Sequence, residues 1–357
     1  MPSILKKVDW QLGVAVAILM TGGLLSLLSS SPEFFYKQIY WIAFSIIVAV
    51  VLIFSDLRSF FSHKTVVRGL YILVVLTLIF ALFFAPRIKG NRSWIVIGSF
   101  QFQPSEFAKV ILIITLAYFF SRAHIGIGRW KIVITSFIYF AILGGLVGIL
   151  PDMGSAFVLF SVWFGFLLIS GMPLKKVIFS AILFAIVFAL MWVSVLKPYQ
   201  KDRILGALFP QRDPMGSNYH VIQSKIAIGS GGIFGKGFRQ GTQVQLGFLP
   251  EAQTDFIFAA VAEEGGLIAV VILIAAFGWM ILRILKIGDL MDGNFNKFLC
   301  LGTAILFLAQ FFLNVGSNLG VLPVIGVTFP FVSYGGSSIL ANMILVGMVQ
   351  SAWVKRS

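Results

Sequence analysis

The sequence contains few of the residues from which soluble enzymes build active sites. It has one cysteine, Cys300, which excludes an intramolecular disulfide and a cysteine-based metal site. Its three histidines, His63, His124 and His220, are far apart and lack metal-ligand spacing. Only 11% of the 357 residues are charged, and 13 are acidic. Soluble domains carry about a quarter charged residues, so the composition argues against an ordinary globular enzyme.

Long apolar runs take the place of charge. Hydrophobic residues make up 59% of the chain, in runs close to the ~20 residues that a helix needs to cross a bilayer. Runs of this length favour helices over the short alternating strands of a membrane barrel. We therefore predict an all-α, polytopic membrane bundle that forms one domain over residues 1–357. Ten transmembrane helices are expected, at residues 11–29, 38–54, 68–85, 104–120, 132–150, 153–171, 176–196, 256–285, 295–316 and 335–354.

The net charge of +14 indicates membrane topology and not nucleic-acid binding. Most basic residues lie in short loops between apolar runs, where they set orientation and contact lipid head groups. Fifteen lie on the side that holds both termini, and four lie in the short loops of the opposite side. By the positive-inside rule, both termini are expected in the cytoplasm. The long loop over residues 197–254 is then extracytoplasmic.

This 197–254 loop is the only connection long enough to form structure outside the membrane. Seven glycines between Gly229 and Gly247 indicate tight turns or close approach to a ligand. Its apolar residues favour a partly ordered loop over a mobile linker. A short amphipathic helix at the membrane surface is also expected, with a face formed by Tyr219, Ile222, Ile226 and Gly229.

Acidic residues near the membrane boundary are costly to place, so each suggests a function. Asp255 begins the eighth span, and we predict that it takes part in chemistry; the alternative is a helix cap. Glu106 and Lys109 lie on one helix face at the start of the fourth span, as a structural ion pair or as part of a site. Asp152, in the turn before the sixth span, is a site residue or an N-cap.

All of these groups map to the outer half of the bilayer. If they converge, they form an external cleft in which a carboxylate can act as a general base. Basic groups could bind a phosphorylated lipid head group there; the candidates are Arg92, Lys109, Arg203, Arg212 and Arg239. The segment before the tenth span, GVLPVIGVTFPFVSYGGSS, is either re-entrant and lines the cleft or is a plain external connection. Its hydroxyls at Ser333 and Ser337 are candidate substrate contacts.

Four of these stretches resemble the SEDS family of bacterial cell-wall proteins (shape, elongation, division and sporulation). In family order they are NRSWIVIGSFQFQPSEFAK (91–109), LPDMGSAF (150–157), FLPEAQTDFIFAAVAEEGG (248–266) and LPVIGVTFPFVSYGGSS (322–338). The resemblance implies a peptidoglycan glycosyltransferase that polymerises lipid II at the outer face of the bacterial cytoplasmic membrane. By position, Asp255 matches the essential acid, expected to deprotonate the acceptor sugar hydroxyl while undecaprenyl pyrophosphate leaves the donor.

The resemblance also implies partners. A divalent cation, Mg²⁺ or Mn²⁺, is expected at the pyrophosphate, although the sequence contains no dedicated metal cage. A class B penicillin-binding protein, which is a transpeptidase, is the expected protein partner within the elongation machinery. Gly-Thr-Gln ahead of FLPEAQTDFIFA resembles the elongation-type (RodA-type) branch more closely than the division-type (FtsW-type) branch.

Two other functions stay open at this point. A lipid II flippase would need polar groups through the full thickness of the bundle, and Glu263 and Glu264, deeper in the eighth span, favour it. A non-catalytic scaffold would leave Asp255 as a mere cap. The concentration of ionisable residues in the outer half of the spans favours the polymerase.

Overall fold

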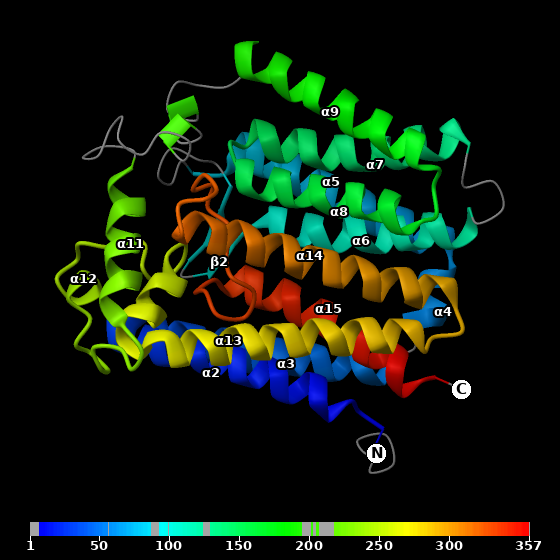
Figure 1. The fold of residues 1–357 in the computed structure, drawn as a ribbon. Helices are drawn as coiled ribbons and strands as arrows, with labels where there is room; N and C mark the ends of the chain where they lie inside the picture. The colour runs from blue at the N-terminus through cyan, green and yellow to red at the C-terminus, as the bar shows by residue number, and fades with distance from the viewer. Residues whose placement is uncertain are drawn as a thin grey trace.

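A computed structural model describes residues 7–55, 57–86, 93–98, 100–123, 129–194, 201–202, 205–206 and 218–356. Helices occupy the ten predicted positions and form one bundle (Figure 1). Among the described residues, eight of them are long and apolar enough to cross a membrane, and α8 is apolar but only 17 residues long. The ten are α2 (Trp10–Ser30), α3 (Pro32–Phe54), α5 (Lys64–Phe84), α6 (Pro104–Arg122), α7 (Trp130–Ile149), α8 (Met153–Ile169), α9 (Leu174–Ser194), α13 (Ile257–Asp289), α14 (Asn294–Asn318) and α15 (Gly336–Val354).

Local signals explain where several helices begin. Asp9 is the N-cap of α2, and its side chain accepts a hydrogen bond from the Leu12 N–H at 2.8 Å. Pro32 and Pro104 stand at the first positions of α3 and α6, where the missing proline N–H costs no helical hydrogen bond. Only Ser31 separates α2 from α3, so these two helices must run antiparallel as a hairpin.

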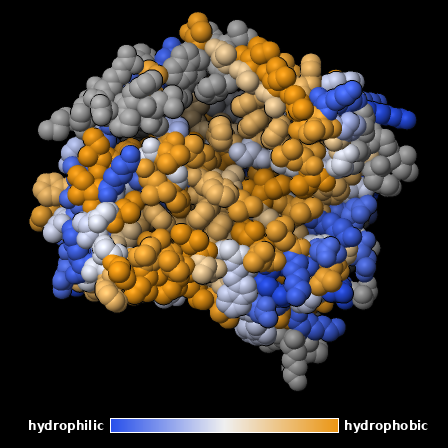
Figure 2. All heavy atoms as spheres, viewed as in Figure 1, coloured by the Kyte–Doolittle hydropathy of each residue, from blue (hydrophilic) through white to orange (hydrophobic). Residues whose placement is uncertain are grey.

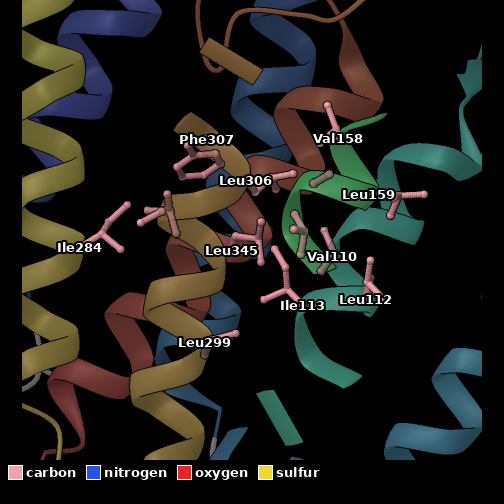
Figure 3. Packing of buried hydrophobic residues seen from close by; sticks show 14 of the residues in the cluster. Val110, Leu112, Ile113, Val158, Leu159, Ile284, Leu299, Leu306, Phe307 and Leu345 are labelled. Atoms are coloured by element: carbon pink, nitrogen blue, oxygen red, sulfur yellow. The ribbon is translucent and has the colours of Figure 1, made fainter. Parts of the chain in front are cut away.

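The core lies between α6, α14 and α15. Figure 3 shows Val110 and Ile113 of α6 packed with Leu306 and Phe307 of α14 and with Leu345 of α15. Side chains on nearly every face of α6 and α15 are buried, as expected for helices at the centre of a bundle. In the view of Figure 2, an apolar surface spans the middle of the molecule between hydrophilic ends, which is the pattern of a membrane-spanning protein.

A two-stranded sheet is a small exception to the all-helical prediction. Strands β1 (Ile95–Ile97) and β2 (Phe100–Phe102) pair antiparallel, with Ile95 opposite Phe102. The hairpin immediately precedes α6. Gln103, between β2 and α6, makes hydrogen bonds in the site described below. A short helix, α4 (Leu57–Ser62), connects α3 to α5.

The two ends of the bundle differ in content. Both termini lie at one end, and α11 (Tyr219–Gly231) and α12 (Thr242–Gln245) lie at the other (Figure 1). The predicted helix at 219–229 is therefore confirmed as α11, which crosses the end of the bundle. Its packed face is formed by Val221, Ser224, Ala227 and Gly231. Ile226, on the predicted apolar face, is exposed, so contact of that face with the membrane stays a prediction.

Helix α13 is broken at Gly266, whose φ of 66° and ψ of −166° are not helical. A side chain at this position would collide with the Gly235 amide, since an added Cβ would lie 2.3 Å from its nitrogen. The chain after α11 passes through the break, with Gly231 and Gly235 tight against the backbone of α13. This close approach explains why the loop is rich in glycine.

Candidate functional site

Asp255 lies in the turn over residues 251–256 that leads into α13. Phe256, and not Asp255, occupies the N-cap position of this helix, and Phe256 makes no capping hydrogen bond through its side chain. The cap comes from another helix, because the Asn318 Oδ1 of α14 accepts a hydrogen bond from the Ala259 N–H at 3.1 Å. The capping explanation for Asp255 therefore does not apply at the N-cap position. The Asp255 side chain is half-buried.

Two buried asparagines of α14 hold the main chain of Asp255. Asn314 Nδ2 and Asn318 Nδ2 donate to the Asp255 carbonyl at 3.0 and 2.8 Å. Asn314 also donates to the Val327 carbonyl at 2.8 Å, so it ties the turn to the segment before α15. The sequence interpretation missed both residues. The available signal was two amides four residues apart, on one helix face within an apolar span.

The segment over residues 322–335 is non-helical and enters the bundle. Residues 329–333 are all buried, and the Val332 carbonyl lies against Gly23 of α2, where an added Cβ would be 2.3 Å from the oxygen. Gly23 is seven residues before the end of α2, which corresponds to a depth of about 10 Å at 1.5 Å per residue. The segment therefore enters the bundle, as the re-entrant alternative predicts, and is not a plain external connection; that it lines a cleft stays a prediction. Protein covers this irregular backbone, as membrane depth requires.

Ser333 joins the re-entrant segment to the turn of Asp255. Its hydroxyl donates to the Thr254 carbonyl at 2.7 Å and accepts from the Phe329 N–H at 2.9 Å. The Tyr334 N–H donates to the Gln253 carbonyl at 2.9 Å alongside. Ser333 is buried, so the structure shows it positioning the turn, and direct contact with substrate stays a prediction.

Asp152 is the N-cap of α8 and also part of a larger network. Its Oδ1 accepts from the Ser155 N–H at 3.0 Å, which confirms the capping alternative. Its Oδ2 accepts from Gln103 Nε2 at 3.0 Å and from Ser105 Oγ at 2.8 Å. One carboxylate thus fixes both α8 and the start of α6.

Ser337, in the first turn of α15, meets the same network from the other side. Its hydroxyl accepts from the Gln103 N–H at 3.0 Å and donates to the Gln101 carbonyl at 3.3 Å. Ser337 is buried, so it too has a positioning role here, and its contact with substrate is a prediction. Gln103 connects Asp152 to Ser337, and sequence reasoning did not identify it.

Glu106 and Lys109 form the predicted ion pair, with Nζ and Oε1 2.7 Å apart. Their side chains are only 6% and 3% exposed. The second oxygen of Glu106 has no hydrogen-bond partner in the part of the chain that the structure describes. Removing one partner of a pair at this depth strands a charge, which typically costs about 3–5 kcal/mol. The pair follows Ser105 directly, so it lies next to the Asp152 network.

Ile325 and Gly326 connect the two halves of the site. The Ile325 carbonyl packs against Gly154, two residues after Asp152; a Cβ added to Gly154 would be 2.3 Å from the oxygen. A Cβ added to Gly326 would lie 3.9 Å from Asp255 Oδ2. Gly154 of α8 and Asp255 therefore flank one dipeptide, and Asp152 is two residues before Gly154. Gly326 has a φ of 72° and no side chain, so it places no side-chain atoms against the Asp255 carboxylate.

The structure does not bring every predicted residue to this place. Arg239 is exposed; it donates to the Leu28 carbonyl at the end of α2 at 3.2 Å and lies over the Phe238 ring. Its contacts are thus with α2 and its own loop. Arg92, Arg203 and Arg212 lie outside the described residues.

Glu263 and Glu264 hold the glycine-rich loop. Glu263 is fully buried and accepts from Lys236 Nζ at 2.8 Å and from the Gln243 and Val244 N–H groups at 2.9 and 3.2 Å. Glu264 accepts from Ser29 Oγ at 2.5 Å. The two acids that favoured transport are therefore engaged in structural hydrogen bonds.

The acidic groups do not form a metal cage. Among the described residues, no three His, Cys, Asp or Glu side chains cluster closely enough to hold a metal ion. The carboxylate of Asp152 already accepts three hydrogen bonds from protein groups. These residues do not fit a resident, all-protein cation site.

Comparisons with known proteins identify one family over nearly the whole chain. The family model for cell cycle proteins of the FtsW, RodA and SpoVE type matches residues 10–357. The peptidoglycan glycosyltransferase MrdB of Escherichia coli is 36% identical over 80% of this chain and 77% of its own length. The probable peptidoglycan glycosyltransferase FtsW of Thiomicrospira cyclica is 33% identical over 97% and 91%.

Solved structures share the fold. A chain of a peptidoglycan synthase complex, solved to explain the coordination of polymerization and crosslinking, matches with a TM-score of 0.83 and 31% identity over 98% of both chains. The crystal structure of the rod shape determining protein RodA of Thermus thermophilus matches with a TM-score of 0.72 and 26% identity, over 98% of this chain and 97% of that one.

Proposed function

The chain belongs to the SEDS family of FtsW- and RodA-type peptidoglycan glycosyltransferases, and we propose that it polymerises lipid II with Asp255 as the general base. The observation that carries this proposal is the construction of the Asp255 turn. Asn314, Asn318 and Ser333 fix the main chain of this turn from two elements, and the residue beside the carboxylate, Gly326, has no side chain. A carboxylate whose main chain is fixed in this way is positioned to take a proton from a hydroxyl within hydrogen-bond reach.

The proposed step transfers one glycan unit. The acceptor sugar hydroxyl gives its proton to the Asp255 carboxylate as its oxygen attacks the anomeric carbon of the growing chain. The bond from that carbon to the undecaprenyl pyrophosphate oxygen breaks, and the pyrophosphate leaves with the electron pair. Attack from the face opposite the leaving group inverts the configuration. General base catalysis of this kind contributes roughly 10²–10⁴-fold in rate.

The pyrophosphate needs positive charge as it leaves. Arg92, Arg203 and Arg212 are the basic residues proposed to supply it, and Mg²⁺ or Mn²⁺ is proposed as a companion that binds with the pyrophosphate. Such ions commonly bind through substrate phosphates together with one or two carboxylates. The lack of a protein cage among the described residues is compatible with that mode of binding. A bound cation would neutralise charge on the leaving group.

Location and partner follow from the same reasoning. Both termini lie at the end of the bundle opposite α11 (Figure 1), and the excess of basic residues on their side favours the cytoplasm for them and the outer face for Asp255. The match to a chain of a peptidoglycan synthase complex supports a class B penicillin-binding protein as partner. Elongation is the proposed role, as the similarity to RodA suggests, with the division role as its alternative.

The test is reconstitution of the purified protein with labelled lipid II, with and without a class B penicillin-binding protein. We expect glycan polymer in the presence of Mg²⁺ or Mn²⁺. A second arm supplies lipid II on one leaflet only. Movement of lipid II to the other leaflet without any polymer would contradict the proposal and support the flippase.

A further inference from the structure

The loop that closes the break in α13 exposes large apolar side chains. Ile233, Phe234 and Phe238 are 60%, 80% and 50% exposed. They belong to residues 233–238, IFGKGF, which we name the anchor loop. Exposed apolar clusters of this kind are costly in water and mark a surface that contacts something apolar.

The backbone of the anchor loop is fixed, so these side chains are held outward. Main-chain hydrogen bonds join the anchor loop and Gly232 to both sides of the break at Gly266. These bonds satisfy main-chain groups that an interrupted helix would otherwise leave unpaired. The four bonds run from the N–H of Lys236 to Glu263 O at 2.9 Å, from Gly237 to Glu264 O at 3.0 Å, from Leu267 to Gly232 O at 2.9 Å and from Ile268 to Ile233 O at 3.2 Å.

The break lies level with the end of α2. Gly22 of α2 packs against Leu273 of α13. Nearer the end of α2 and the start of α13, Ser29 bonds Glu264 at 2.5 Å. Helix α2 has 21 residues, which at 1.5 Å per residue is about 31 Å, close to the ~30 Å hydrocarbon thickness of a bilayer. The end of α2, the break and the anchor loop therefore share the height of one membrane boundary.

The apolar surface of the anchor loop continues an apolar face of the bundle. Ile233 is bonded directly beside Ile268, and the outward residues of α13 that follow are also exposed and apolar. They are Leu267 at 55%, Ile268 at 45%, Val271 at 55% and Ile272 at 52%. In a membrane protein such a face contacts lipid, so the anchor loop extends the lipid-facing surface to its outer edge.

The charge around the anchor loop matches a lipid head-group layer. Residues 229–250 contain no acidic residue and two basic ones. Lys236 is paired with the buried Glu263 at 2.8 Å, so Arg239 is the basic residue of this stretch that is left for a head group. Arg239 is exposed and lies over the Phe238 ring, 5.5 Å from its centroid. Phenylalanine together with basic side chains is typical of surfaces that lie in the membrane interface, where the cation reaches phosphate oxygens.

We propose that the anchor loop inserts Ile233, Phe234 and Phe238 into the outer leaflet, with Arg239 on the phosphates of anionic phospholipids. The loop then clamps the extracytoplasmic layer of the protein to the bilayer surface at the height of the α13 break. This clamp is independent of the glycosyltransferase reaction proposed above, and its test does not use activity.

Depth measurement by spin labelling tests the clamp. Cys300 is the only cysteine and is buried, so Cys300→Ala gives a background for single labels. Nitroxides are placed at Phe234→Cys and, in a second variant, at Phe238→Cys. The protein is embedded in nanodiscs of phosphatidylethanolamine and phosphatidylglycerol. Collisions with oxygen, which partitions into lipid, are compared with collisions with a water-soluble nickel complex.

Two references calibrate the depth. Ile272→Cys reports the lipid face of α13, and Asp289→Cys, exposed beyond the membrane end of the same helix, reports water. We expect labels at 234 and 238 to collide more with oxygen than with nickel, with an oxygen-to-nickel collision ratio between those of the two references. The ratio should shift toward the value for water when phosphatidylcholine replaces phosphatidylglycerol. Labels that match Asp289→Cys would overturn the proposal. If collisions of the labels with the nickel complex fall only after a class B penicillin-binding protein is added, the loop contacts that protein and the proposal of lipid contact is wrong.

Discussion

Asn318→Leu separates positioning of Asp255 from the carboxylate itself. The asparagine is buried and has no part in the proposed proton transfer, yet it holds the Asp255 carbonyl at 2.8 Å and caps α13 through the Ala259 N–H at 3.1 Å. Leucine has the same branching and the same number of side-chain heavy atoms, so the change keeps a similar shape. It removes both of these bonds, and with them the bond from Asn318 Nδ2 to the Asn314 carbonyl at 2.8 Å. Asn314 continues to hold the Asp255 carbonyl at 3.0 Å.

The expected loss of turnover follows from the bonds to the Asp255 carbonyl and from the Ala259 N–H. Loss of a helix cap costs about 1 kcal/mol, and loss of one of two hydrogen bonds to a buried carbonyl costs about 1 kcal/mol more. If the whole of this ~2 kcal/mol is lost from positioning in the transition state, the rate falls by roughly 30-fold. The loss should appear in kcat more than in KM, because substrate binding groups are unchanged.

The assay is polymerisation of lipid II at saturating substrate, together with thermal unfolding in detergent. Asn296→Leu, at the opposite end of the same helix, controls for the added leucine. Turnover equal to that of the unchanged protein would refute the positioning role of Asn318. A fall in turnover matched by Asn296→Leu would show instead that any change in α14 is harmful.

Three further outcomes are expected. Lys109→Met should lower the free energy of unfolding by about 3–5 kcal/mol, and Glu106→Gln combined with it should restore most of that loss; equal losses in the single and double variants would argue against the ion pair. Gly326→Ala should cost about 1 kcal/mol of strain at its positive φ and lower turnover, whereas Gly145→Ala, at an open helical position, should do neither. Glu263→Gln should speed hydrogen exchange of the loop amides that it binds, and unchanged exchange would contradict its role.

Much of the fold was predictable because membrane spans follow from length and polarity. All ten predicted helices exist, and residues 322–335 enter the bundle, which was one of the two alternatives for that segment. The site was predictable as a set of single residues. Asp152 and the Glu106–Lys109 pair show the local contacts that their spacing indicated.

Long-range partners were not predictable from the sequence. Asn318 lies 59 residues from Ala259, and Gln103 lies 234 residues from Ser337, and no local pattern encodes such pairs. The interpretation of Glu263 was incomplete for the same reason, since its partners come from a loop that returns to it after α11. Arg239 was predicted to lie near the acidic residues only because it maps to the same side of the membrane. In the structure it contacts α2 instead.

The most direct test of the central claim is the turnover of Asp255→Asn in lipid II polymerisation. Asparagine keeps the shape of the side chain and cannot accept the proton, so a general base at this position predicts a loss of roughly 10²–10⁴-fold, with folding and partner binding intact. Asp289→Asn, the same substitution at the far end of α13, should leave turnover unchanged. Full polymer synthesis by Asp255→Asn would contradict the assignment of Asp255 as the base.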